Sequence, residues 1–199
     1  MIFIKEGHMI KLLKKIIKNI LFRPLGLKKF GKNSYIKRPF NINEREKISI
    51  GSNSFIHNNC EIIMISNNVK KVFNPKLIIG DNIYIGKFFH LHCMSNIVIG
   101  NGCVISDNVF ISAASHSFDP YCGNIMQQEL TFADIVICDN TFIGRNVFIG
   151  QGVVLGEHCV VGANSVVTKS FEPYSMIGGI PAKVLKRYDQ IKKEWIKIA

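Results

Sequence analysis

The stretch ICDNTF-IGRNVF-IGQGVV-LGEHCV-VGANSV, residues 137–166, decides the fold of this chain. It repeats every six residues, and each unit opens with Ile, Leu or Val. The same period runs through residues 50–61, 79–96 and 99–116, so that all 13 units share this first position. A fixed short period is the mark of a solenoid, in which each repeat packs only on its neighbours.

The six-residue period predicts a parallel β-helix. Each short strand contributes one inward aliphatic side chain, and three strands make one coil of 18 residues. Position five can also pack inward near a corner, and its occupants are small or β-branched with one aromatic exception: Ser54, Cys60, Ile83, Phe89, Ser95, Cys103, Val109, Ser115, Thr141, Val147, Val153, Cys159 and Ser165. Stacked coils would bury one continuous aliphatic column.

Length and composition fit one domain. The chain has 199 residues, 47% of them hydrophobic, and no run of 18 or more apolar residues that could span a bilayer. Lys14, Lys15 and Lys18 interrupt the N-terminal apolar segment, so we expect no signal peptide and a cytoplasmic protein. None of the six cysteines forms a Cys-x-x-Cys pair, and those at position five fit small core residues better than metal ligands.

The positive charge lies at the chain ends. Residues 1–47 hold 13 Lys or Arg against 3 Glu, and residues 183–199 hold 6 against 2 acidic residues. Residues 10–21 alternate apolar and Lys positions at helical spacing, which predicts an amphipathic helix. We interpret it as a cap on the first coil, the alternative being contact with the anionic inner face of the membrane. No aromatic-basic motif accompanies the charge, so nucleic-acid binding is not expected.

The repeat breaks at defined places. Residues 64–78 are off the six-residue period and are expected to bulge outward, and a two-residue slip falls at residues 97–98. The largest break, residues 117–135, predicts a long excursion loop, a frequent location of function in solenoids. After the repeat ends, residues 184–197 predict a short basic helix.

These breaks divide the chain into three parts. Residues 1–47 form a basic N-terminal capping segment, and residues 48–175 form the β-helix with its excursion loop. Residues 176–199 form the C-terminal tail and helix.

His116 is the candidate catalytic residue. It closes a repeat unit and opens the long loop, so its imidazole should lie on the outer surface beside a movable wall. A general base must lie within hydrogen-bond reach of the group that it deprotonates, and imidazole is matched to neutral pH. The alternative is a turn histidine that bonds only to the backbone.

The segments IGNGCVISDNVFISAASHSFDP, IGRNVFIGQGVVLGEHCVVGANSVVTK and GGIPAKVLKRYD resemble the bacterial hexapeptide-repeat O-acetyltransferases. The resemblance covers roughly residues 30–190. It is greatest to the branch that modifies lipopolysaccharide O-antigen and capsule sugars, and more distant to the maltose and galactoside acetyltransferases. It implies that the β-helix is left-handed, although crossover connections in ordinary parallel sheets are right-handed.

The resemblance also implies a homotrimer with clefts between subunits, acetyl-coenzyme A as donor, a saccharide acceptor, no metal, and direct transfer with His116 as base. The positions that match the family's donor site are Arg145 through its main chain, Ala163, Thr168, Lys169, Lys183 and Lys186. Lysines also suit the anionic phosphates of the donor, the alternative being an ordinary solvated helix face.

The chain departs from the family at the acceptor side. An asparagine of the galactoside enzymes aligns approximately with His92, and their substrate carboxylate has no clear counterpart. His92 is therefore a candidate for catalysis or acceptor contact, and His90 is a weaker one. Asp119 could orient His116 in a dyad, or could instead cap the turn before Pro120.

Other functions remain open at this stage. Within enzymes the alternatives are an N-acetyltransferase for a nucleotide-linked amino sugar and an antibiotic acetyltransferase. A zinc hydratase of the carbonic-anhydrase type would need His90, His92 and His116 to converge on one metal. A non-catalytic scaffold is the last alternative.

Overall fold

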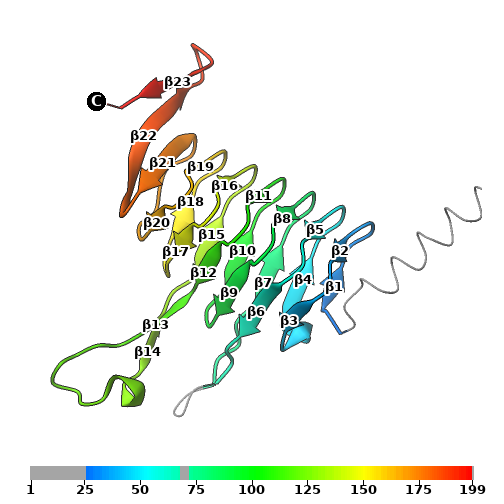
Figure 1. Cartoon of the computed structure of the whole chain (residues 1–199), viewed down its shortest axis with the longest axis vertical. Coiled ribbons are helices and arrows are strands. Elements are labelled where there is room, and N and C mark those ends of the chain that lie inside the picture. The colour runs from blue at the N-terminus through cyan, green and yellow to red at the C-terminus, as the bar shows by residue number, and fades with distance from the viewer. Residues whose placement is uncertain (1–25, 68–71, 199) are drawn as a thin grey trace, which may run out of the picture.

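The chain winds as a left-handed parallel β-helix with three sheets along its length (Figure 1). The computed structural model describes residues 26–67 and 72–198. Ile137 in one coil pairs with Leu155, 18 residues further on, in the next coil. The parallel β-helix expected from the sequence is confirmed, whereas the helix expected at residues 10–21 lies outside the described residues.

The three parallel sheets take one strand from each coil. Sheet A has the order β1 (Lys29–Phe30), β4 (Ile48–Ile50), β7 (Leu77–Ile79), β10 (Ile97–Ile99), β15 (Ile135–Ile137) and β18 (Val154–Leu155). Sheet B has the order β2 (Tyr35–Ile36), β5 (Phe55–Ile56), β8 (Tyr84–Ile85), β11 (Val104–Ile105), β16 (Phe142–Ile143), β19 (Val160–Val161), β21 (Ser175–Gly179), β22 (Ala182–Asp189) and β23 (Glu194–Lys197). Sheet C has the order β20 (Val166–Val167), β17 (Phe148–Ile149), β12 (Phe110–Ser112), β9 (His90–Cys93), β6 (Cys60–Met64) and β3 (Phe40–Ile42). A 3-10 turn, η1 (Arg45–Lys47), joins the first two coils.

The first position of each repeat fills the core, as the period predicts. These side chains form columns, and the column of sheet C includes the fully buried Ile62, Leu91, Ile111, Ile149 and Val167. Phe89, the one aromatic residue at position five, is also fully buried. It fits because Cys60 and Val109, in the adjacent coils, are smaller.

Asparagine makes many of the corners between strands. Asn108, Asn146 and Asn164 occupy one corner of successive coils with φ between 57° and 59°. Asparagine tolerates this left-handed conformation better than most residues with a side chain. Their amides form a ladder with N···O distances of 2.9 Å in both steps, which stacks the coils in register.

The β-helix begins earlier than the sequence analysis expected. Residues 1–47 were assigned to a capping segment, but β1, β2 and β3 already pair in parallel with β4, β5 and β6. Residues 30–47 thus form a first coil, in which Phe30 replaces the opening aliphatic residue. The period was hidden because an aromatic residue opens the first unit, and because eight residues instead of six separate Ile42 from Ile50.

The C-terminal helix expected at residues 184–197 is wrong. β22 and β23 form an antiparallel hairpin that extends sheet B beyond the coil (Figure 1). A hairpin satisfies the backbone of the last parallel strand, β21, whereas a helix would leave that edge unpaired. Tyr188 packs between Tyr174 and Trp195, with ring centroids 6.4 Å and 5.4 Å away.

In residues 26–67 and 72–198 we find no helix long and apolar enough to span a membrane.

Candidate active site

The excursion expected at residues 117–135 is a β-hairpin arm that leaves the coil after β12 and returns before β15 (Figure 1). Its strands are β13 (Ala114–His116) and β14 (Leu130–Phe132), with a short 3-10 turn, η2 (Ile125–Gln127), near its tip. His116 pairs with Leu130, and Ser115 with Thr131. Because successive side chains of a strand point to opposite faces, the arm has a His116 face and a Ser115 face.

The return of the arm is fixed to the coil by Asp134. Its carboxylate accepts hydrogen bonds from the Ser95 hydroxyl and, at 2.8 Å, from the Asn96 backbone N–H. The Ser95 hydrogen bond lowers the pKa of Asp134 below its ordinary value; burial opposes this shift, and the Asn96 hydrogen bonds add to it. The arm therefore has an ionised anchor at neutral pH.

The His116 face of the arm meets the loop of residues 65–76. The Phe73 ring contacts the Phe132 ring edge-on, with centroids 4.9 Å apart. Bulging of this loop was expected from the break at residues 64–78. Its described parts lie beside the base of the arm, so the loop forms a second wall near His116.

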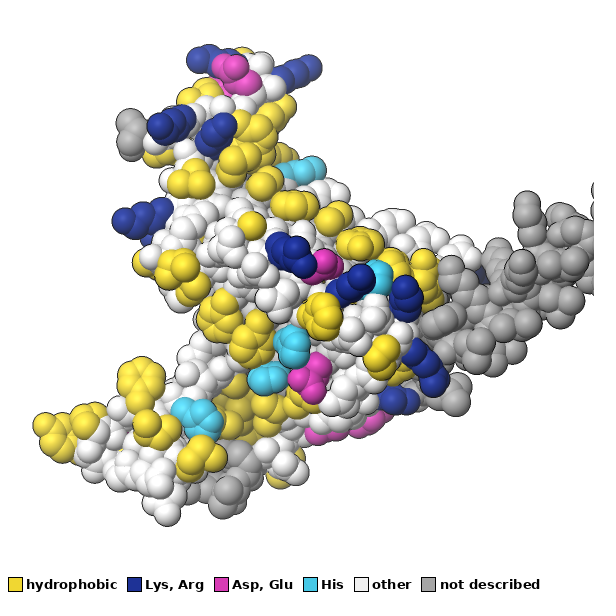
Figure 2. All heavy atoms as spheres, in the orientation of Figure 1, with side chains coloured by type: hydrophobic (Ala, Val, Ile, Leu, Met, Phe, Trp, Pro, Cys, Tyr) yellow, Lys and Arg dark blue, Asp and Glu magenta, His cyan; other side chains and the backbone are white. Residues whose placement is uncertain are grey.

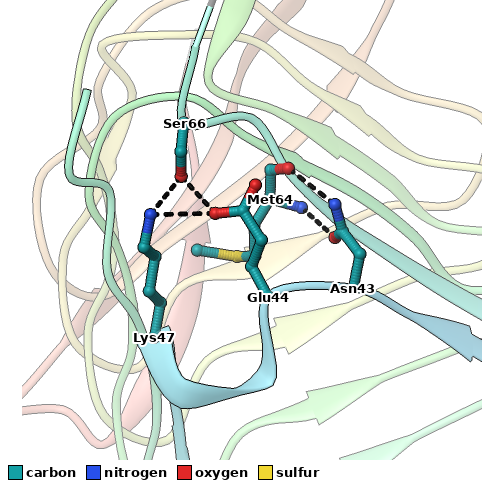
Figure 3. Close-up of polar contacts among 5 residues, drawn as sticks. All are labelled: Asn43, Glu44, Lys47, Met64 and Ser66. Atoms are coloured by element: carbon teal, nitrogen blue, oxygen red, sulfur yellow. Dashed lines mark hydrogen bonds and ion pairs between the residues drawn. The ribbon is translucent and has the colours of Figure 1, made fainter. Parts of the chain in front are cut away.

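The base of this loop is clamped to the coil below (Figure 3). The Ser66 hydroxyl donates to the Glu44 carboxylate and accepts from the Lys47 ammonium, which also pairs with Glu44 at 2.8 Å. The Asn43 amide pairs with both backbone groups of Met64, at 2.7 Å and 2.9 Å. Burial raises the pKa of Glu44, but the hydrogen bonds from Lys47 and Ser66 and the Lys47 charge outweigh it and lower that pKa.

His116 itself is exposed at the end of β13. Asp119, its candidate partner, accepts the Tyr121 backbone N–H at 2.9 Å, and its own N–H donates to Gln128 at 2.9 Å. This is the geometry of the capping alternative, because the carboxylate is engaged by the turn. The imidazole is thus available to a ligand on the open side of the arm.

The opposite face of the arm borders an open pocket of about 540 Å³. Ser115, Ser117 and Phe118 line it from the arm, and Gln151 lines it from the coil. The Gln151 amide donates to the Thr131 hydroxyl at 3.0 Å, while its buried Oε1 has no hydrogen-bond partner among the described residues. The sequence analysis missed Gln151, because the fold alone brings it against the arm.

His90 and His92 lie on the outer face of sheet C, where both side chains are half-buried. The His90 Nδ1 lies 3.3 Å from Glu61 Oε2, and the His92 ring packs edge-on against Phe110 with centroids 5.0 Å apart. Histidine and acidic side chains gather on this face beside the arm (Figure 2). Among the described residues, no three His, Cys, Asp or Glu side chains lie close enough to hold a metal ion.

The positions expected to bind the donor all follow the arm in sequence, on the last coils and on the C-terminal hairpin. Arg145 and Ala163 are stacked at the corner between sheets B and C, where the Arg145 carbonyl accepts the Asn164 N–H at 2.8 Å. The Arg145 guanidinium is exposed and lies 3.7 Å from Asp107. Thr168 and Lys169 follow β20 at the opposite corner of sheet C, so one chain does not bring these two pairs together.

Lys183 and Lys186 share one face of the C-terminal hairpin. Lys183 pairs with Gly178 and Lys186 with Met176, two residues apart on β21. Residues three apart on a regular strand face opposite sides, but a bulge at Leu185 restores a common face. The two lysines therefore lie on a common face, on a strand in place of the expected helix.

Known proteins share this architecture. A family described as bacterial transferase hexapeptide (six repeats) matches residues 134–169. The putative lipopolysaccharide biosynthesis O-acetyl transferase WbbJ of Escherichia coli K12 is 34% identical over 125 residues, which cover 59% of this chain and 64% of that protein. A chloramphenicol acetyltransferase of Agrobacterium fabrum is 29% identical over 150 residues, covering 60% of this chain and 72% of that protein.

A solved structure gives the same answer for the fold. A variant of AntD, an N-acyltransferase from Bacillus cereus solved in complex with dTDP and coenzyme A, matches with a TM-score of 0.70 and 25% identity. The match covers 92% of this chain and 90% of that one. These matches confirm the resemblance to the bacterial hexapeptide-repeat transferases that was stated from the sequence. Its alignment with WbbJ spans less than two thirds of that protein.

Proposed function

We propose that this protein transfers an acetyl group from acetyl-coenzyme A to a hydroxyl of a saccharide destined for a cell-surface polysaccharide. His116 Nε2 takes the hydroxyl proton while the oxygen attacks the thioester carbonyl. The C–O bond forms, the C–S bond breaks, and the proton passes to the departing thiolate. The observation that carries the proposal is an exposed His116 at the base of an arm in a hexapeptide-repeat transferase.

The arrangement of polar side chains about the arm supports this assignment. The positions that match donor contacts, from Arg145 to Lys186, lie on the coils after the arm and on the C-terminal hairpin, whereas His90 and His92 lie on a coil before the arm. A donor and an acceptor approaching from these two sides would meet at the arm. The base therefore stands where the two substrates must come together.

A homotrimer belongs to the proposal, because large apolar side chains of the arm are exposed to solvent in a single chain. Phe118, Tyr121 and Met126 are 77%, 95% and 74% exposed. A second copy of this chain would cover these side chains and bring the arm to a neighbour's coil, which would also join donor contacts that one chain keeps apart. Because acetyl-coenzyme A is a cytoplasmic metabolite, the proposal includes a cytoplasmic location. The proposal also includes contact of the basic N-terminal segment with the inner face of the membrane.

N-acylation of a nucleotide-linked amino sugar is the second candidate. The likeness to AntD, at a TM-score of 0.70, favours it as strongly as the sequence match to WbbJ favours a hydroxyl acceptor. A panel of acceptors distinguishes the two, because O-acetyl esters are lost in mild base whereas N-acetyl amides survive.

The test follows release of free coenzyme A with that panel, using the full chain, His116→Ala and His158→Ala. His158 is an exposed histidine stacked on Tyr174 at another corner, which makes it a matched control. We expect His116→Ala to lower turnover by about 10²–10⁴, the usual contribution of a general base, with coenzyme A affinity retained. Equal turnover in His116→Ala and the parent would refute the base assignment.

A further inference from the structure

One row of side chains on the outer face of sheet C is linked by polar contacts across three coils. The Asn41 amide donates to Glu61 Oε1 at 2.9 Å, and Glu61 Oε2 lies 3.3 Å from His90 Nδ1. Both carboxylate oxygens of Glu61 are thus engaged, one by each neighbour. The contact fixes the imidazole orientation and leaves Nε2 as the ring nitrogen away from the carboxylate.

Packing of the β-helix does not require these residues. The corresponding outer row of sheet A is aliphatic, with Ile78, Val98 and Val136 in register. The side chains of His90 and Glu61 are 44% and 36% exposed, and such surface pairs contribute little to stability. A carboxylate that aligns one histidine is instead the usual arrangement for a histidine that contacts a ligand.

The same face offers an aromatic surface beside the aligned histidine. Phe110 follows His90 in the row, and its ring has His92 edge-on at 5.0 Å and His90 at 6.5 Å. His92 pairs with Ser112, two residues before the arm begins at Ala114. This surface therefore continues to the strand that carries His116. An apolar ring flanked by hydrogen-bonding groups suits a sugar, which has a C–H face and hydroxyls at its rim.

We propose that this surface, comprising His90, His92 and Phe110, is the acceptor subsite, and that Glu61 is a positioning residue acting through His90. With Nδ1–H donating to Glu61, Nε2 of the neutral imidazole is a hydrogen-bond acceptor. It selects a ligand group that donates, such as a sugar hydroxyl, over a phosphate or carboxylate, which can only accept. The inference rests on the proposed function, because it gives a substrate class to the site of His116.

The first test needs no ligand. In ¹⁵N-detected NMR of the full chain near pH 8, His90 is expected as the Nδ1–H tautomer, and Glu61→Gln is expected to shift it toward the Nε2–H form that free histidine prefers. His158→Gln, at a distant corner, should leave the His90 signals unchanged. A His90 tautomer that is the same with and without the Glu61 carboxylate would overturn the positioning role.

The second test measures sugar binding without any donor, by saturation-transfer difference NMR with the methyl glycosides of glucose, galactose and N-acetylglucosamine. We expect one of these probes to bind the parent, and His90→Gln and Glu61→Gln to weaken it about tenfold, with coenzyme A affinity unchanged. Glu61→Gln and His90→Gln keep the size of the side chains, and circular dichroism verifies the fold. Binding equal to the parent in both variants, or no binding of any probe to the parent, would overturn the subsite.

The two proposals fail in different ways. Loss of sugar binding in Glu61→Gln, in a protein that never releases coenzyme A with any acceptor, would support the subsite and count against the transferase. If a sugar drives release of coenzyme A and Glu61→Gln leaves the KM for that sugar unchanged, the result would support the transferase and count against the subsite.

Discussion

The ring of Phe73 lies edge-on against the ring of Phe132, with centroids 4.9 Å apart, and so joins the 65–76 loop to the arm. Both segments interrupt the repeat, and neither belongs to a sheet of the coil. The contact lies on the face of the arm that carries His116. The loop is therefore held to the arm as a wall on the side of the candidate base.

Phe73→Ala should loosen this wall. An edge-to-face aromatic pair contributes about 0.5–1.5 kcal/mol beyond its buried area, so removing one ring should raise backbone hydrogen exchange in β14 while leaving β12 protected. Turnover should fall by roughly threefold to tenfold, because His116 would be held less firmly. Val72→Ala serves as the control, since Val72 is 87% exposed. Unaltered exchange at residues 130–132 would mean that the arm is held without the loop.

The Asp134 anchor predicts a response to acid. Asp134 has a lowered pKa in the folded chain, so its contribution to stability is present above the unfolded pKa of about 4 and is lost as pH falls through the folded value. The anchor should thus be complete at neutral pH and fail only in acid. Its carboxylate is exposed, so Asp134→Ala should cost no more than about 1 kcal/mol at pH 7, and less in acid.

Urea unfolding at pH 7 and pH 3 measures this difference, with Asp189→Ala as a control. Asp189 also has a lowered pKa and caps a turn, but it lies in the C-terminal hairpin. Only the Asp134 variant should increase hydrogen exchange in the arm. A loss of stability that is equal at both pH values would contradict the role of an ionised anchor.

The rate at which cysteine thiols react should differ between the buried core and the exposed arm. Burial raises the pKa of Cys60 and Cys93 to about 12 and that of Cys103 to about 11, so few thiolates form there at pH 8. Cys122 is exposed near the tip of the arm. Native titration with a disulfide reagent should therefore show one fast thiol, which Cys122→Ser removes. Fast reaction of all six cysteines would mean that the column opens readily.

The hexapeptide period was enough to predict the coil, because each opening aliphatic residue has one geometric role. Ile111 and Ile149 pack into the column as the period requires. The first coil was missed because Phe30 opens it with an aromatic residue and because eight residues, instead of six, separate Ile42 from Ile50. The C-terminal hairpin was missed because the residues from Lys183 to Lys186 suit a helix locally, and only the open edge of β21 requires strands.

The candidate site was only partly predictable. His116 was found because it stands at the largest break in the period, which is visible in one sequence. The contact between Glu61 and His90 was not found, since these residues are 29 positions apart. They become neighbours on adjacent coils only because the 65–76 loop leaves the coil between them. Gln151 likewise reaches Thr131 only after the arm folds back. Contacts that depend on where a loop returns carry no local sequence signal.

The common face of Lys183 and Lys186 predicts how the donor is held. Replacing both with Gln should raise KM for acetyl-coenzyme A about tenfold with little change in turnover. Phosphate contacts far from the thioester stabilise the ground and transition states alike. The effect should weaken at high salt, because exposed charges are screened over about 8–10 Å at ordinary ionic strength. Lys192→Gln with Lys193→Gln is the matched control, as this pair lies between the strands of the same hairpin.

Deleting Leu185 tests whether the bulge matters. Without Leu185, Lys183 and Lys186 would be two residues apart on a regular strand and would still face the same side. We expect KM for acetyl-coenzyme A to stay near that of the parent, because both charges and their common face remain. Acetyl-pantetheine, which lacks the nucleotide phosphates, should be used equally well by the parent and by each variant. If the double Gln variant shows the same rise in KM with acetyl-pantetheine as with acetyl-coenzyme A, the lysines support the hairpin, and the donor contact would have to be withdrawn.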